Sequence, residues 1–334
     1  MSLWRAFWSL LAVATALSVA SVGLYASDQK KSKDDPNQIG DRDVGKCLNF
    51  YSFDKEMAWG KQLADEVARE SKINDDPIVT EFINRIGQNL VRSSDAKVPF
   101  TFRVIEGDEM NAFALPGGFV FVYSGLIELA SDEDEFAGAL AHEIAHVAAR
   151  HMTCRATKTQ VANIASVIPG IFLGGLAGLA AREAARTAVP MTALSFSRHD
   201  ETEADYLGVQ YMYAAGYDPT GAVSILEKLE SLQKTKPSAV GKILATHPVD
   251  SDRIDRTEKE IQRILPDKAE YVVTTSEYRE VRERLIAQEN RRKTDPKDGR
   301  PVLHQKSGNG KVDDDPAAQQ DDRPTIIKRN DLIE

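Results

Sequence analysis

The chain has 334 residues, of which 42% are hydrophobic and 28% are charged, and its formal net charge is −9. This composition is that of a globular protein with one or two domains, and it excludes a collagen-like or wholly disordered chain. The chain lacks a basic excess that could neutralise phosphates, so we expect no nucleic-acid partner. Two cysteines are too few for a four-thiolate zinc site or a disulfide-rich scaffold.

Residues 1–26 differ in kind from the rest of the chain. One positive side chain, Arg5, precedes an uncharged stretch from Ala6 to Tyr25. The pattern is typical of a signal peptide, and about 20 apolar residues would also suffice for a retained membrane anchor. Both alternatives export the remaining chain from the cytoplasm.

Composition divides the remaining chain into three parts. Residues 27–49 are polar and contain Pro and Gly, which predicts a linker. Residues 290–334 are rich in Pro, Asp and Gln and poor in apolar side chains, which predicts a disordered polar tail. The folded domain is therefore expected over residues 50–289.

Periodicity predicts a helix and three strands in the first half of this domain. Apolar residues at helical spacing follow Pro77, which suits a first turn; they are Val79, Phe82, Ile83, Ile86 and Leu90. Alternating residues 101–104 predict a short strand. Asn111–Leu115 and Phe119–Tyr123 predict two more strands, joined by a Pro-Gly-Gly turn.

Helices are expected to dominate the second half. Ser131 is predicted to cap a helix that has carboxylates at residues 132–134 in its first turn, where the helix dipole favours negative charge. Three further helices are predicted, at Asp200–Ala215, Thr220–Gln233 and Ser251–Ile264. Helices that flank a small sheet indicate an α+β fold, mainly helical.

The helix after Ser131 carries an HExxH motif. His142 and His146 lie one turn apart on the same face, so both imidazoles can bind one Zn²⁺. Glu143 can reach an attacking water without binding the ion, as the general base of a metalloprotease does. A chance match is the alternative, but an apolar helix is a costly place for these side chains without a metal.

A catalytic zinc needs a third protein ligand. The downstream candidates are His151, His199, Glu201, Glu203, Asp205 and His247. Glu201 and Asp205 share a helix face, so one can bind the metal while the other holds a ligand imidazole. For Glu201 the alternative is a carboxylate that serves only the helix dipole.

Five motifs in order resemble the HtpX-like gluzincin family, peptidase family M48, over roughly Phe50–Ile264. They are the strand and turn of residues 111–118, HExxH, the ExxAD motif of residues 201–205, the turn of residues 214–219, and the His247-Pro248 element with Arg253. The resemblance implies a zincin-type metalloprotease domain and one Zn²⁺ per chain.

The resemblance also assigns roles to single residues. It implies that His142, His146 and Glu201 bind the zinc, that Glu143 is the general base on a zinc-bound water, and that Asp205 orients a ligand imidazole from outside. We expect Glu203 to be solvated and His151 and His199 to lie beside the ligands or at the surface. His304 falls in the predicted tail.

His247 has three alternative roles. The resemblance allows a fourth ligand that caps the zinc in a latent state, or a side chain that stabilises the substrate oxyanion. The remaining alternative is a polar turn residue, because Pro248 and Ser251 suit the entry into the next helix.

The expected substrates are polypeptides. The strand around Asn111, Ala112, Phe113 and Ala114 is expected to pair with an extended substrate. We therefore predict a zinc endopeptidase for unfolded or misassembled envelope proteins, in the periplasm or at the periplasmic face of the inner membrane of a bacterium. The alternative is a chaperone-like quality-control factor whose proteolysis is latent.

Two further features concern the surroundings of the site. Residues 161–181 are uncharged but contain Pro169 and four glycines, which favours a lid in contact with the membrane surface over a transmembrane hairpin or buried core. Cys47 and Cys154 are compatible with a disulfide in an oxidising compartment, and Cys154 also with a small buried residue.

Overall fold

The computed structural model describes residues 35–161 and 196–294. The predicted signal peptide or anchor, 1–26, lies outside the described residues, as do nearly all of the apolar stretch 161–181 and most of the tail 290–334. The chain separates into two compact units, Met1–Asn290 and Arg291–Glu334. The elements below belong to the first unit, apart from the last turn of the final helix.

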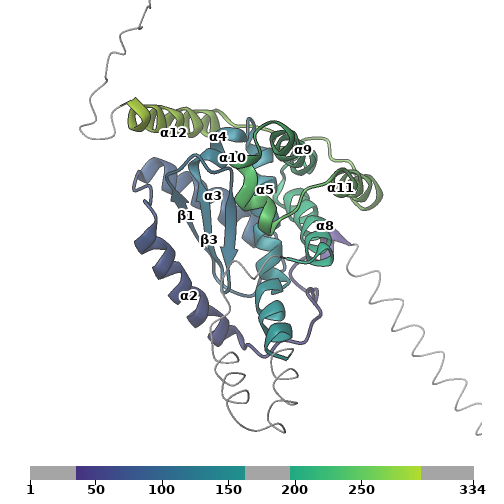
Figure 1. Ribbon diagram of the computed structural model, residues 1–334. Coiled ribbons are helices and arrows are strands. Elements are labelled where there is room, and N and C mark those ends of the chain that lie inside the picture. Colours follow the sequence, from purple (N-terminus) through teal and green to yellow (C-terminus); the bar gives the residue numbers. More distant parts are fainter. Residues whose placement is uncertain (1–34, 162–195, 295–334) are drawn as a thin grey trace, which may run out of the picture. The chain divides into compact units, whose positions relative to one another are not determined.

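A three-stranded sheet lies in the middle of the domain (Figure 1). Its strands are β1 (Thr101–Ile105), β2 (Ala112–Leu115) and β3 (Phe119–Tyr123), in the order β1-β3-β2. β3 is antiparallel to β2 and parallel to β1. The predicted hairpin is confirmed, and Gly117 and Gly118 make its turn with φ values of 75° and 92° that favour glycine. Within the described residues, β2 is therefore an edge strand.

Each face of the sheet is covered by helices. The alternating side chains of the strands point to opposite faces, and α2 (Phe53–Glu70) packs on the face that presents Leu115 and Phe121. The other face carries Val120 and Val122 and packs in the main core with α3 and α5. In α3 (Pro77–Arg92), Pro77 occupies the first turn and the predicted apolar residues are buried, so that prediction is confirmed.

The central helix is α5 (Glu133–Ala148), which contacts α3, α8, α9 and β2. Small residues allow this close packing, because a side chain at Gly138 would collide with the backbone of Ala222. The predicted cap was wrong by one residue. Asp132 holds the N-cap position without a side-chain hydrogen bond, while the hydroxyl of Ser131 accepts a hydrogen bond from Lys228.

The C-terminal helices follow the prediction closely. They are α8 (Arg198–Ala215), α9 (Thr220–Thr235) and α11 (Ser251–Ile264). Ser197 and Asp200 form a capping box at the start of α8, and Gly216 ends it with a φ of 91°. The α+β fold, mainly helical, is confirmed.

Several elements were not predicted, α2 among them. The others are η1 (Pro36–Gln38), α4 (Ser124–Leu129), α10 (Pro237–Thr246), α12 (Ser276–Thr294) and a helix that begins at His151. α12 is charged around most of its circumference and contributes only a narrow apolar stripe to the core, Tyr278, Val281 and Leu285. Such a stripe is too weak a periodic signal to identify a helix from sequence.

The described part of the predicted linker, from residue 35 onward, is attached to the domain at several places. The buried guanidinium of Arg42 lies 2.6 Å from the carboxylate of Asp95, and Val44 joins the main core. Cys47 forms a disulfide with Cys154, with 5.9 Å between the Cα atoms. The sequence had left this pairing open.

Loss of this disulfide is expected to destabilise the domain. The bond joins residues 107 positions apart, and a loop of that length gives a large entropic effect on the unfolded chain. Cys154→Ala should lower the free energy of unfolding by about 2–5 kcal/mol, measured by urea denaturation. A reducing agent should lower the stability of the wild type by a similar amount and leave the variant unchanged. Equal denaturation midpoints for the oxidised and reduced wild type would contradict this prediction.

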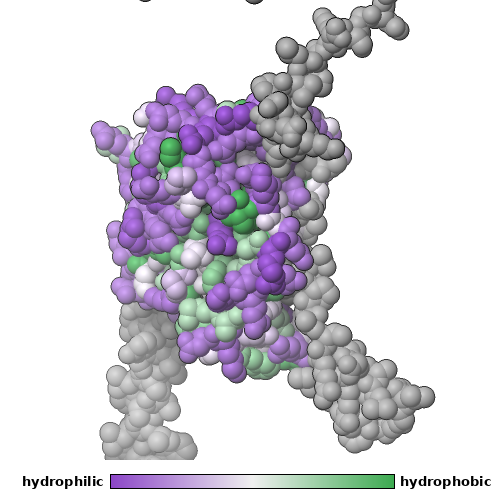
Figure 2. Space-filling view, turned by 90° about the vertical axis from the view of Figure 1, so that its left-hand side faces the viewer, coloured by the Kyte–Doolittle hydropathy of each residue, from purple (hydrophilic) through white to green (hydrophobic). Residues whose placement is uncertain are grey.

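The surface is mainly hydrophilic, with apolar areas of limited size on the face in view (Figure 2). Leu48, Phe50 and Phe53 are large apolar side chains that remain exposed near the start of α2. No helix within residues 35–161 and 196–294 is long and apolar enough to cross a membrane.

Candidate metal centre

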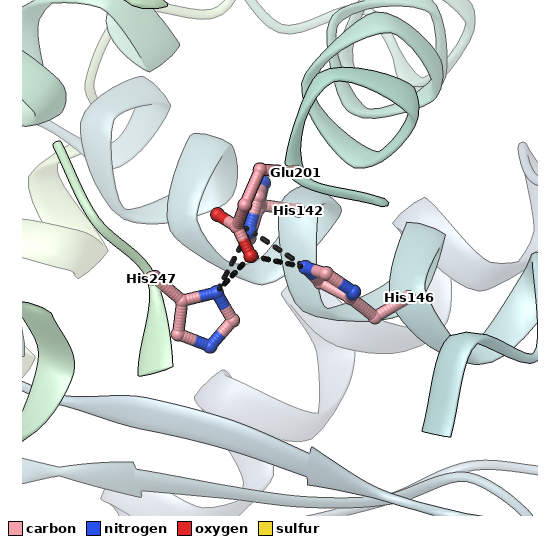
Figure 3. A group of neighbouring side chains, drawn as sticks. All are labelled: His142, His146, Glu201 and His247. Atoms are coloured by element: carbon pink, nitrogen blue, oxygen red, sulfur yellow. Dashed lines mark hydrogen bonds and ion pairs between the residues drawn. The ribbon is translucent and has the colours of Figure 1, made fainter. Parts of the chain in front are cut away.

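Two helices bring the first three predicted ligands together. His142 and His146 project from α5, and their Nε2 atoms lie 2.9 Å apart. Glu201 lies in the first turn of α8, and its carboxylate oxygens are 3.4 Å from Nε2 of His146 and 3.5 Å from Nε2 of His142. Figure 3 shows the three side chains pointing toward a common point.

His247 completes this group from the end of α10. Its Nδ1 is 3.2 Å from Nε2 of His142 and 3.0 Å from Oε1 of Glu201 (Figure 3). One ligand atom from each of the four residues lies within 4.8 Å of all the others. Three imidazole nitrogens and one carboxylate oxygen are a donor set from which proteins build tetrahedral zinc sites, so these residues fit a zinc ion.

Glu143 lies beside this group but is not among the converging ligands. Its Oε2 accepts a hydrogen bond of 2.9 Å from the backbone N–H of Ala114 in β2, and its Oε1 lies 3.5 Å from Nε2 of His247. Burial raises the pKa of Glu143 above its ordinary value. The carboxylate is therefore both close to the centre and easier to protonate than a solvated glutamate.

Asp205 contacts the outer nitrogen of His142. Its Oδ1 lies 2.9 Å from Nδ1 of the imidazole, which leaves Nε2 to face the centre. Burial would raise the pKa of Asp205, but the charge of Arg253 and the hydrogen bond with His142 outweigh it and lower the pKa to about 2. Burial likewise opposes the charged form of His142, but Asp205 and Glu201 raise its pKa to about 9.

Arg253 is a member of the site for which the sequence suggested no role. Its guanidinium lies 2.7 Å from Asp205 and 2.8 Å from Glu201. Arg253 therefore holds in place both carboxylates of the ExxAD motif. Its position six residues after His247 was the only signal in the sequence.

The remaining candidates fall in different places. Nδ1 of His151 lies 2.9 Å from Nδ1 of His146, and Nε2 of His151 lies 3.3 Å from Glu203. The expectation that Glu203 is solvated was wrong, because its side chain is only 16% exposed. His199 is 85% exposed and lies outside the group. His304 lies outside the described residues.

Phe196 was missed by the sequence analysis. Its ring stacks on the imidazole of His146, with 3.9 Å between ring centres. An apolar cavity also borders His142 and Glu143; its lining includes Ile225, Leu226, Leu229, Ile243 and Val249. Apolar side chains therefore border the polar cluster.

Comparison with known proteins agrees with this geometry. Residues 77–261 match peptidase family M48. The beta-barrel assembly-enhancing protease of Escherichia coli is 31% identical over 262 residues, which are 76% of this chain and 53% of that protein. A putative protease of the same name from Vibrio cholerae is 32% identical over 267 residues, 77% of this chain and 53% of that protein.

A mitochondrial relative is also similar. The mitochondrial metalloendopeptidase OMA1 of Schizosaccharomyces pombe is 32% identical over 184 residues, which are 54% of this chain and 52% of that protein. The chain spans about half the length of the curated relatives it matches. The chain therefore belongs to peptidase family M48.

Proposed function

We propose that this chain is a zinc-dependent endopeptidase in which His142, His146 and Glu201 bind the metal and Glu143 is the general base. The observation that carries the proposal is the convergence of the ligand atoms within 4.8 Å, beside a buried carboxylate. When bound, Zn²⁺ supplies the Lewis acidity that polarises a peptide carbonyl and acidifies the attacking water.

The chain's own side chains supply the proton transfers and the alignment. Glu143 accepts the proton of the attacking water and returns it to the leaving amine, a task suited to a carboxylate whose pKa burial has raised. Asp205, fixed by Arg253, keeps Nε2 of His142 turned toward the metal position.

The substrate that fits this site is an extended polypeptide. Within the described residues β2 pairs with β3 alone, so its other edge can bind a substrate strand through backbone hydrogen bonds. The N–H of Ala114 points from that edge to Glu143, so a peptide paired with this edge would have its backbone beside the proposed general base. The residues of this chain that pair with the substrate in this proposal are Asn111, Ala112, Phe113 and Ala114.

Backbone recognition gives broad specificity, which suits unfolded or misassembled envelope proteins. The names of the bacterial relatives, which refer to beta-barrel assembly, support a role in the periplasm or at the periplasmic face of the inner membrane. The predicted export signal agrees with this location. Membrane-surface contact through residues 161–181 is part of the same proposal.

A chaperone-like factor with latent proteolysis is the second candidate, and the position of His247 favours it. A fourth donor among the ligand atoms would occupy the position that a catalytic zinc keeps open for water. We therefore assign His247 as a latch that would hold the metal at rest and would move away when substrate enters.

Replacement of His247 is expected to raise the basal activity. His247→Ala opens the fourth position of the metal, so both casein cleavage and self-cleavage of the full chain should increase over the wild type. His199→Ala is the matched control, because His199 is exposed and lies outside the group. A fall in activity by about 10²–10³-fold would instead identify His247 as an oxyanion stabiliser, and unchanged activity would make it a turn residue.

Removal of the metal tests the proposed function itself. A strong chelator should abolish casein cleavage by the purified full chain, and one equivalent of Zn²⁺ per chain should restore it. Cleavage that persists in the metal-free protein would refute a zinc peptidase. Zinc-dependent retention of unfolded casein without cleavage, also in His247→Ala, would favour the chaperone-like alternative.

A further inference from the structure

His146 makes contacts on both of its ring nitrogens. Nε2 faces His142 and Glu201, at 2.9 Å and 3.4 Å, while Nδ1 lies 2.9 Å from Nδ1 of His151. On the other side of His151, Nε2 lies 3.3 Å from Oε2 of Glu203. The side chains of His146 and His151 are each only 3% exposed. The three residues thus form a buried hydrogen-bonded series that leads away from the candidate metal centre.

When His146 and His151 are both neutral, hydrogen-bond chemistry allows one arrangement of protons along this series. An ionised Glu203 can only accept, so His151 must carry its proton on Nε2. Nδ1 of His151 is then an acceptor, and His146 must donate to it from Nδ1. The lone pair of His146 is consequently on Nε2, the nitrogen that faces the other ligands. A metal binds the lone pair of a neutral imidazole.

The backbone is bent in a way that brings His151 onto His146. α5 ends at Ala148, and a new helix begins at His151. Between them Arg150 has a φ of 57°, the only positive φ of a non-glycine residue within the described ranges. This left-handed conformation is unfavourable for a residue with a side chain, and such strain persists only where surrounding contacts hold it.

Contacts of the Arg150 guanidinium hold this bend. Its Nε donates to Glu56 at 2.8 Å and its Nη2 donates to the carbonyl of Tyr51 at 2.5 Å. Glu56 belongs to α2 and is itself buried. The strained turn is therefore fixed from outside the helix, and its result is the close approach of two imidazoles that lie five positions apart.

We propose that His151 and Glu203 are positioning residues that orient His146 toward zinc through a two-step hydrogen-bond relay. The proposal rests on the proposed function, because it assumes that His146 is a zinc ligand. The relay is separate from the contact between His142 and Asp205, which acts on the other imidazole. Two independent supports thus hold the two histidines of the HExxH motif.

The test is the affinity of the full chain for Zn²⁺, measured by competition with a chromophoric chelator. His151→Leu and Glu203→Ala should each weaken zinc binding by about 10–100-fold, as loss of an outer hydrogen-bond partner does. The two residues act in series, so the double variant should bind zinc about as weakly as either single variant. Asp205→Ala acts on His142, so its effect should multiply with that of Glu203→Ala.

A conservative variant separates positioning from packing. The amide of Gln at position 151 can donate to Glu203 and accept from His146, with the same direction of hydrogen bonds. His151→Gln should therefore bind zinc more tightly than His151→Leu. Urea denaturation of the metal-free variants serves as a control, because Glu203 also accepts a hydrogen bond from the N–H of Gly45 at 3.4 Å. If His151→Leu fails to fold, the zinc affinities of the single and double variants are measured with His151→Ala in its place.

Two results would overturn the relay. One is wild-type zinc affinity in His151→Leu or Glu203→Ala. The other is a double variant whose loss of affinity is the product of the two single losses, because that would make the two residues independent. If the wild type itself binds no zinc, the proposed function fails together with the relay. Tight zinc binding by the wild type and all relay variants would overturn the relay alone.

Discussion

Glu143→Gln is expected to retain one zinc ion per chain and to lose casein cleavage by about 10²–10⁴-fold, the usual contribution of a general base. The amide cannot accept a proton from the attacking water. It can still accept the hydrogen bond from the N–H of Ala114, so the local structure should be preserved. Glu143 lies outside the converging ligand atoms, so zinc content should not change.

Metal analysis and casein digestion on the same preparation check this prediction. The matched control is Glu227→Gln, the same substitution at an exposed position of α9. The activity is best measured in a His247→Ala background as well, where the proposed latch is absent. Cleavage by Glu143→Gln at the wild-type rate would contradict the assignment of Glu143 as the general base. A loss of zinc in this variant would instead indicate that Glu143 is a metal ligand.

Glu201→Ala is expected to lose most of its zinc and, with it, all casein cleavage. The carboxylate is the one negatively charged member of the converging group, and it also lies 2.8 Å from the buried Arg253. Its removal should weaken zinc binding by more than the ~10–100-fold that the loss of an outer partner costs. It also leaves the guanidinium with Asp205 as its remaining ion-pair partner in the site.

Zinc affinity by chelator competition measures this effect. Glu227→Ala on α9 is the matched control, because it makes the same exchange at an exposed helical position. Circular dichroism of both proteins shows whether the helices persist. Equal zinc affinity in Glu201→Ala and the control would return the third ligand to the remaining candidates, of which His247 is the one that belongs to the converging group.

Local periodicity explains why the central part of the site could be predicted. His142, Glu143 and His146 lie within five positions of one helix, so their relative placement follows from helical geometry alone. The same reasoning placed Glu201 and Asp205 on one face of α8. The approach of α8 to α5 depends on tertiary packing, and there the family resemblance supplied what the residue pattern could not.

Features that depend on distant parts of the chain were not predictable in this way. Glu203 was expected in solvent because it points away from Glu201. Its side of α8 in fact faces His151, which the bend at Arg150 brings close. The pairing of Cys47 with Cys154 likewise joins segments 107 positions apart. A sequence read in short windows carries no information on such contacts.

The hydrogen bond between Ala114 and Glu143 has a consequence for solubility. An open edge strand is a template on which other strands, including those of a second copy, can add and aggregate. A substrate-binding edge cannot be covered permanently without loss of access. Here the carboxylate of Glu143 occupies the N–H of Ala114 in the absence of substrate. The edge is thus protected at that position by the side chain proposed as the general base, and a peptide would have to displace this carboxylate in order to pair fully with β2.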